Sequence, residues 1–250
     1  MRIIISPAKK MKDDEDSLAF LGMPVFLEKT TRLMNWLKLL NIEEAKTLWE
    51  CNDKLAQQNF ERFQNMRLDT RLTPAIISYE GIQYQYMAPT VFEDSMLSYV
   101  QEHLRILSGF YGVLKPMDGV TPYRLEMQAK IKMDGIKNLY DYWGDKLYNE
   151  VLDDSHVVIN LASKEYSKCI EAYLQPQDRF ITCIFGELSD GKVIQKGTYA
   201  KMARGEMVRF MAEKQITVPE DIRKFDRIGY HFVETLSTNT EYVFIKESTS

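Results

Sequence analysis

The feature that most constrains the fold is a pair of short β-branched runs set among helical patterns. The runs are Arg2 to Ser6 and His156 to Leu161. Continuous apolar runs of this length predict strands buried on both faces of a sheet. Helical spacing recurs around them, for example over Leu27 to Leu40 and Thr198 to Gln215, and no linker divides the chain. We therefore expect α/β or mixed α+β architecture, as a single domain over residues 1–250 with a mixed sheet.

Composition narrows the class of protein. The 250 residues are 45% hydrophobic, which is ample for a core, and the formal net charge is only −4. Any anion site must therefore come from local clustering of Lys and Arg. The cysteines are Cys51, Cys169 and Cys183, odd in number and far apart, which fits neither a disulfide framework nor a CxxC site. No apolar run is long enough for a signal sequence or a membrane span. We expect a cytoplasmic protein with no membrane contact.

Two glycines at a tight turn stand out near the middle of the chain. A helical stripe through Met96 and Leu107 leads directly into Gly109 and Gly112. Glycine is favoured where φ is positive, or where bare N–H groups approach a phosphate. Gly109 could equally be the residue that ends a helix. Both interpretations are open at this point.

Local signals predict further elements. Asn41 and Glu44 match a capping box that opens a helix reaching Phe63. Ala75 to Tyr79 is typical of a strand, and Gly81 to Tyr86 of a turn with an aromatic continuation.

The main enzyme signatures are absent. There is no Walker motif, no G-x-G-x-x-G after a strand, no G-x-S-x-G and no H-E-x-x-H. His103, His156 and His231 are isolated from one another. The sequence predicts no metal site and no cofactor. It favours a binding protein and leaves catalysis open.

The chain has four polar clusters, and three of them follow or adjoin the ends of the expected elements, where ligand sites gather in α/β proteins. The four clusters are Ser6 to Lys10; Tyr123, Arg124 and Glu126; Asn160 and Ser163; and Lys201 and Arg204. Cations outnumber acids in this set, which predicts a site for an anion. The alternative is that Arg124, Glu126 and their neighbours form internal ion pairs that organise loops.

Several motifs, in this order, resemble the YaaA peroxide-stress-response family over essentially the whole chain. They are ISPAK at Ile5 to Lys9, HLRILSGFYGVLKPMD at His103 to Asp118, PYRLEM at Pro122 to Met127, NLYDYWGD at Asn138 to Asp145, VVINLASKEY at Val157 to Tyr166, and YAKMARG at Tyr199 to Gly205. The chain departs from the pattern at Lys10, Lys115 and Glu206. Glu206 adds a negative charge close to Arg204.

The resemblance implies a bacterial protein that limits iron-dependent damage to DNA during hydrogen peroxide stress and binds double-stranded DNA. It also implies an unusual α/β fold with a basic cleft and a helix-hairpin-helix element, which would lie at about 94–116 here. Hairpin backbone and nearby cations would hold phosphates without reading bases. The residues expected to bind DNA are Lys9, Lys10, Gly109, Gly112, Lys115, Arg124, Lys201 and Arg204. No obligate protein partner is expected.

Two other functions remain as alternatives. One is an enzyme acting on damaged DNA or on a phosphorylated small molecule. Its catalytic candidates are Lys9, as an imine-forming amine, and Glu126, as an acid or base. The other is an iron-sequestering protein, which the scarcity of histidine and the scattered cysteines argue against.

Overall fold

The computed structural model describes residues 1–14 and 16–247, and its largest sheet is mixed. The strands of that sheet are β1 (Arg2–Ile5), β5 (Leu104–Ser108), β6 (Gly112–Leu114), β8 (Val157–Leu161), β9 (Arg179–Ser189), β10 (Lys192–Ile194), β11 (Asp226–Arg227), β12 (Tyr230–Phe232) and β13 (Glu241–Lys246). Their order is β11-β12-β13-β9-β8-β1-β5-β6, with β10 paired to β9. Strands β13, β9, β8, β1 and β5 run parallel, and the outer strands are antiparallel. The expected mixed α/β fold is confirmed.

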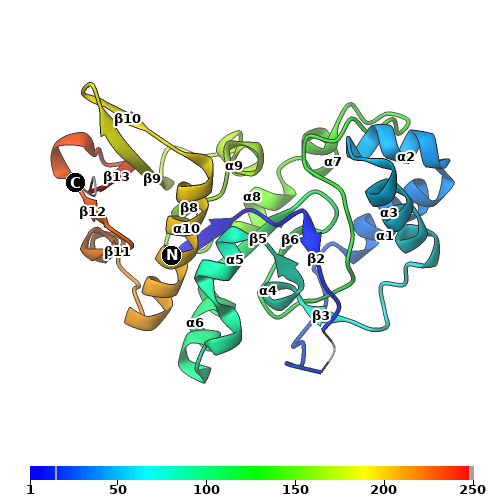
Figure 1. Ribbon diagram of the computed structural model, residues 1–250, viewed down its shortest axis with the longest axis horizontal. Coiled ribbons are helices and arrows are strands. Elements are labelled where there is room, and N and C mark those ends of the chain that lie inside the picture. The colour runs from blue at the N-terminus through cyan, green and yellow to red at the C-terminus, as the bar shows by residue number, and fades with distance from the viewer. Residues whose placement is uncertain (15, 248–250) are drawn as a thin grey trace.

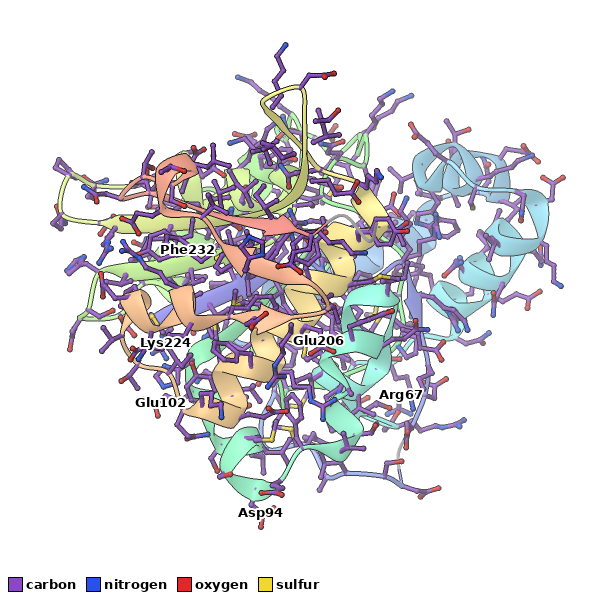
Figure 2. The ribbon with its side chains drawn as sticks, turned by 60° about the vertical axis from the view of Figure 1, so that its left-hand side comes forward. Arg67, Asp94, Glu102, Glu206, Lys224 and Phe232 are labelled. Carbon is purple, nitrogen blue, oxygen red and sulfur yellow. The ribbon has the colours of Figure 1, made fainter. Side chains whose placement is uncertain are left out.

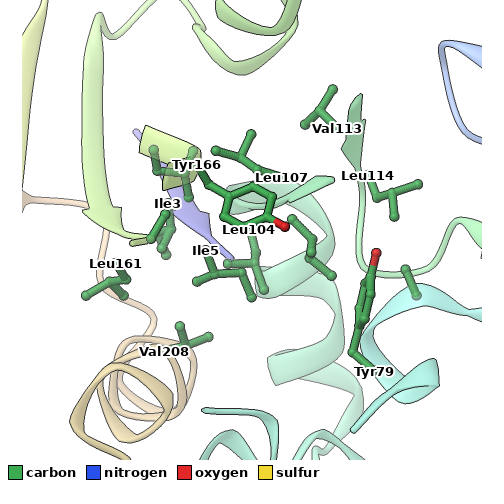
Figure 3. Close-up of a cluster of buried hydrophobic side chains, with 14 of the residues drawn as sticks. Ile3, Ile5, Tyr79, Leu104, Leu107, Val113, Leu114, Leu161, Tyr166 and Val208 are labelled. Atoms are coloured by element: carbon green, nitrogen blue, oxygen red, sulfur yellow. The ribbon is translucent and has the colours of Figure 1, made fainter. Parts of the chain in front are cut away.

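Both β-branched runs form central strands, as predicted. Ile3 of β1 lies between Leu104 of β5 and Ile159 of β8, and all three side chains are fully buried. Figure 3 shows Ile3, Ile5 and Leu104 in one apolar cluster, with side chains from neighbouring helices around them. Burial on both faces explains why these strands have no polar alternation.

Helices surround the sheet and also form a separate group at one end of it. Their bounds are α1 (Leu27–Leu39), α2 (Ile42–Trp49), α3 (Asp53–Asn65), α4 (Ala75–Ser78), α5 (Ile82–Met87), α6 (Asp94–His103), α7 (Leu139–Trp143), α8 (Lys146–Val151), α9 (Lys164–Glu171) and α10 (Gly197–Lys214), with 3₁₀ turns η1 (Pro89–Val91), η2 (Pro219–Lys224) and η3 (Glu234–Leu236). Two short strand pairs join β2 (Lys10–Met11) to β4 (Tyr79–Glu80), and β3 (Thr73–Pro74) to β7 (Gly119–Val120). In Figure 1, α1, α2 and α3 lie on the right, far from the C-terminal strands. No helix in the described part of the chain is long and apolar enough to cross a membrane.

The capping box is present, but the helix that it opens is shorter than expected. Asn41 Oδ1 accepts the Glu44 N–H, and Glu44 Oε2 accepts the Asn41 N–H. Glu50 takes a left-handed conformation, with φ of 44°, and ends α2. Asn52 then caps α3, so the predicted single helix is two.

The predictions for residues 75–86 are wrong in detail. The expected strand from Ala75 is the short helix α4, followed by the two-residue strand β4. The expected turn at Gly81 is followed by helix α5, which packs against α10. Gly205 of α10 makes that contact possible, because a Cβ there would lie 2.2 Å from the Gln83 carbonyl oxygen.

The helix-hairpin-helix expected at about 94–116 is a helix followed by a β-hairpin. Helix α6 ends at His103, and β5 and β6 pair antiparallel after it. All five residues of β5 are buried, so its apolar run fits a strand that is covered on both sides. From the sequence alone, a short apolar run does not distinguish a buried strand from a helix that continues to Leu107.

The two glycines of this hairpin are buried against the protein itself. A Cβ on Gly109 would lie 2.5 Å from the Leu125 carbonyl oxygen. Gly112 has φ of +79°, and a Cβ there would lie 2.8 Å from the Trp143 ring. The Trp143 indole N–H also donates to the Gly109 carbonyl, at 3.1 Å. Close packing thus accounts for both glycines, and neither ends a helix.

Candidate anion-binding pocket

A cavity of about 550 Å³ opens beyond the carboxyl ends of the neighbouring parallel strands β1 and β8. We call it the basic pocket. It is lined by residues 6–10, 80–84 and 123–126, by Ser163, Glu165 and Tyr166, and by Lys201 and Arg204. Along the chain, the next strand of this sheet after β1 is β5, which lies on one side of the β1–β8 pair. The next strand after β8 is β9, which lies on the other side, so the order of the strands reverses between β1 and β8. Ligands of open α/β sheets commonly bind at such a point.

Hydrogen bonds hold the loop after β1 in place. Ser6 Oγ accepts the Ser163 N–H at 2.8 Å, at the start of α9. The Tyr84 hydroxyl of α5 donates to the Ser6 carbonyl at 3.0 Å. The segment that leads to Lys9 and Lys10 is therefore tied both to α9 and to α5.

Glu126 joins two of the expected cationic residues. Its Oε1 lies 3.0 Å from Lys9 Nζ and 3.5 Å from an Arg124 guanidinium nitrogen. The Lys9 side chain is 69% exposed, whereas that of Arg124 is only 11% exposed. Lys10 pairs in the same way with Glu80, at 2.9 Å. Internal ion pairs, the alternative drawn from the sequence, therefore exist inside the pocket.

Lys201 and Arg204 come from one face of α10, because residues three apart are neighbours on a helix. Arg204 is partly buried, and burial lowers the pKa of its guanidinium. Among the described residues it forms no hydrogen bond or ion pair, and its Nε is buried without a partner. An Arg in this state is a strong site for a ligand anion, since its charge is otherwise unpaired.

Glu206 does not neutralise Arg204. Its Oε2 lies 3.4 Å from an Arg227 guanidinium nitrogen. Figure 2 labels Glu206 on α10, near the C-terminal strands. Glu206, which departs from the family pattern, therefore pairs with Arg227 outside the basic pocket.

Tyrosines form much of the remaining wall. The Tyr123 hydroxyl lies 2.8 Å from the Tyr79 hydroxyl and 2.6 Å from Ser108 Oγ. Burial raises the pKa of Tyr123 to about 12, and it raises the pKa of Tyr84 well above its usual value. These phenols are uncharged at neutral pH, so they add no negative charge to the pocket.

The structure brings together six of the expected site residues. They are Lys9, Lys10, Arg124, Glu126, Lys201 and Arg204. Gly109 and Gly112 do not line the pocket, although Gly109 packs behind Leu125 and Glu126 in its wall. Lys115 lies elsewhere, in a cavity of about 320 Å³ that it shares with Arg105 and Asp118.

Sequence reasoning missed Gln83, Tyr84 and Glu165. The first two fall in a segment whose pattern predicts a turn instead of α5. Glu165 lies two residues beyond Ser163, in the first turn of α9, so the same strand-end argument could have found it. Asn160, also expected at the site, is instead buried, and its amide oxygen accepts the Ala162 N–H.

Comparison with known proteins agrees with the motifs. A family model described as peroxide stress protein YaaA matches residues 1–236. A UPF0246 protein of Agathobacter rectalis is 62% identical over 244 residues, covering 98% of each chain. UPF0246 proteins of Lachnoclostridium phytofermentans and Desulfitobacterium hafniense are 58% and 56% identical, each over 246 residues, with 98% of this chain and 96% and 98% of theirs covered. This chain belongs to the YaaA family of peroxide stress proteins.

Proposed function

We propose that the protein acts in the bacterial cytoplasm during peroxide stress by binding double-stranded DNA, and so limits iron-dependent oxidative damage to it. Membership of the peroxide stress family supports the role in stress. The observation that carries the DNA part is the guanidinium of Arg204, which has no partner among the described residues and shares one pocket with Lys9, Lys10, Arg124 and Lys201. These cations come from three separate segments of a chain whose formal net charge is −4.

The proposed contact is with phosphate. Lys and Arg side chains that hold phosphates fix the position of a protein on DNA without reading its sequence. Each such contact releases counterions, so affinity falls steeply as salt rises. We expect binding that is almost independent of sequence and strongly dependent on salt. The hairpin backbone of Gly109 and Gly112 has no part in this proposal, because both residues are buried.

The test is the affinity for a short duplex, measured by fluorescence anisotropy over a range of salt concentrations. The double variant Lys9→Gln/Arg204→Gln removes two pocket cations. Its plot of log K against log salt should be shallower than that of the wild type by about one unit for each phosphate that is no longer neutralised. An unchanged slope would remove the basis of the proposal.

The chain offers a matched control. Lys115→Gln/Lys130→Gln removes the same amount of charge at two exposed lysines outside the basic pocket. We expect this double variant to keep the wild-type slope. If it lowered the slope as much as the pocket variant, binding would depend on overall charge and not on the pocket.

A second candidate is an enzyme acting on damaged DNA or on a phosphorylated small molecule. It is favoured by the 3.0 Å contact between Lys9 Nζ and Glu126 Oε1, which places an amine beside a carboxylate inside a cavity. An amine must lose its proton before it attacks a carbonyl, and the neighbouring carboxylate is placed to accept it. Borohydride trapping on duplex DNA with an abasic site tests the lyase version. A covalent adduct that does not form with Lys9→Gln would establish it.

A further inference from the structure

The basic pocket contains more than a phosphate needs. Three carboxylates, from Glu80, Glu126 and Glu165, line it beside the cations. Glu80 and Glu126 are used in ion pairs with pocket cations. Glu165 has no ion pair among the described residues. A carboxylate facing a pure phosphate site would weaken it, so the presence of Glu165 calls for a different explanation.

Within the described part of the chain, the carboxylate of Glu165 is held by the backbone and has no side-chain partner. Its Oε1 accepts the Gln128 N–H at 3.2 Å, and no side-chain donor among the described residues bonds to either of its carboxylate oxygens. The side chain is partly buried, and desolvation raises its pKa. A desolvated carboxylate of this kind is satisfied by a ligand N–H group.

The pocket also has a nonionic part. Tyr84, Tyr123 and Tyr166 are each at least 95% buried and line the cavity together with Leu125. Gln83 is 94% buried, and its amide nitrogen has no hydrogen-bond partner within the described chain. Apolar and aromatic walls are typical of sites for planar ligands, and amide and carboxylate groups bind the polar edges of bases.

We propose that the basic pocket binds a single nucleotide, with its phosphate at Arg204 and Lys201 and its base beside the tyrosines, where Glu165 accepts an N–H of the base. This inference rests on the proposed binding of phosphate in the same pocket. A cavity of about 550 Å³ has the size that small-molecule sites have. The nucleotide comes either from solution or from a DNA strand, where it has been swung out of the stack.

The first experiment uses calorimetry with the four deoxynucleoside 5′-monophosphates, inorganic phosphate and the four nucleosides. At least one monophosphate should bind ten times more tightly than phosphate and than its own nucleoside. Glu165→Gln should weaken that monophosphate at least fivefold, whereas its binding of phosphate should be as tight as that of the wild type or tighter. Because a glutamine oxygen also accepts the Gln128 N–H, this variant keeps the fold, and its phosphate binding verifies that. Arg204→Gln should weaken both ligands.

Glu171→Gln is the matched control. Glu171 lies on the same helix as Glu165 but pairs with Lys164 outside the pocket. The Glu171→Gln variant should bind the monophosphate as tightly as the wild type does. If phosphate and monophosphates bind equally, or if Glu165→Gln behaves like Glu171→Gln, the nucleotide inference is overturned and a phosphate site is left.

The second experiment separates the two sources of the nucleotide. A duplex with one mispaired position is compared with the fully paired duplex. If the nucleotide comes from a strand, the mispaired duplex binds more tightly, and Glu165→Gln removes the difference. If it comes from solution, the two duplexes bind alike while the monophosphate still binds. If neither duplex binds but the monophosphate does, the result contradicts the proposed function and supports the nucleotide site.

Discussion

Glu126 Oε1 lies 3.0 Å from the ammonium of Lys9, so a residue after β1 and one from the 123–126 segment meet across the basic pocket. The same oxygen lies 3.5 Å from Arg124. One carboxylate thus holds two cations near each other, which would otherwise repel. It also cancels part of the charge that a ligand anion would use.

Glu126→Gln tests this balance. The change removes one negative charge from the pocket and leaves a side chain of the same size beside Lys9 and Arg124. We expect duplex affinity at low salt to rise by a few fold, since each phosphate then meets a more positive site. Anisotropy titrations with the duplex measure the effect. The control variant is Glu61→Gln, because Glu61 lies on α3 outside the pocket. A fall in affinity below that of the control would show that the carboxylate itself contacts the ligand.

The hairpin glycines give a second prediction. Gly109→Ala brings a methyl group against the Leu125 carbonyl, because the added Cβ would lie 2.5 Å from the carbonyl oxygen. We expect a loss of about 1–3 kcal/mol in the free energy of unfolding, as for other overpacked positions. Urea denaturation measures it. A hairpin that contacted DNA would instead lose duplex affinity at unchanged stability, and that result would favour phosphate binding by the hairpin backbone.

Gly205 provides a third prediction, about the contact between α10 and α5. An added Cβ would lie 2.2 Å from the Gln83 carbonyl, so Gly205→Ala should force the helices apart and cost about 1–3 kcal/mol. Gly197→Ala is the control on the same helix, because nothing lies within 4 Å of its added methyl group. Thermal unfolding measures the melting temperature of both variants. Equal melting temperatures would contradict the close packing of α10 on α5 at Gly205.

Asp118 gives a prediction about pH. Burial raises the pKa of its carboxyl to about 6 from the usual 3.8. The folded state therefore binds a proton more tightly than the unfolded chain, and stability falls as pH rises through 6. Between pH 5 and pH 7.5 the wild type should lose about 1 kcal/mol that Asp118→Asn does not lose. Parallel urea titrations at the two pH values measure this difference, and equal losses in both proteins would be evidence against the shift.

The sequence is most informative where one signal has one structural meaning. The β-branched runs at Arg2 and His156 and the capping box at Asn41 all lead to the observed elements. The run from Leu104 to Leu107 does not, because an apolar segment of that length suits a buried strand or a helix equally well. Only its pairing with β1 decides between the two.

The pocket shows the same limit. Polar residues just after strands are recognisable in the sequence, and the parallel pairing of β1 with β8 brings Ser6 and Ser163 together. Lys115 carries the same charge as Lys201 and lies beside a predicted turn. Its place outside the pocket follows from the β-hairpin, which the local pattern does not predict.

The most direct test of the central claim is chemical footprinting of lysines, read by mass spectrometry with and without a duplex. Lys9, Lys10 and Lys201 are exposed in the free protein, as are Lys115 and Lys130 outside the pocket. If DNA phosphate occupies the basic pocket, the first three lysines should lose reactivity when the duplex is added, and the other two should keep it. Protection of Lys115 and Lys130 with Lys9, Lys10 and Lys201 still reactive would contradict the account.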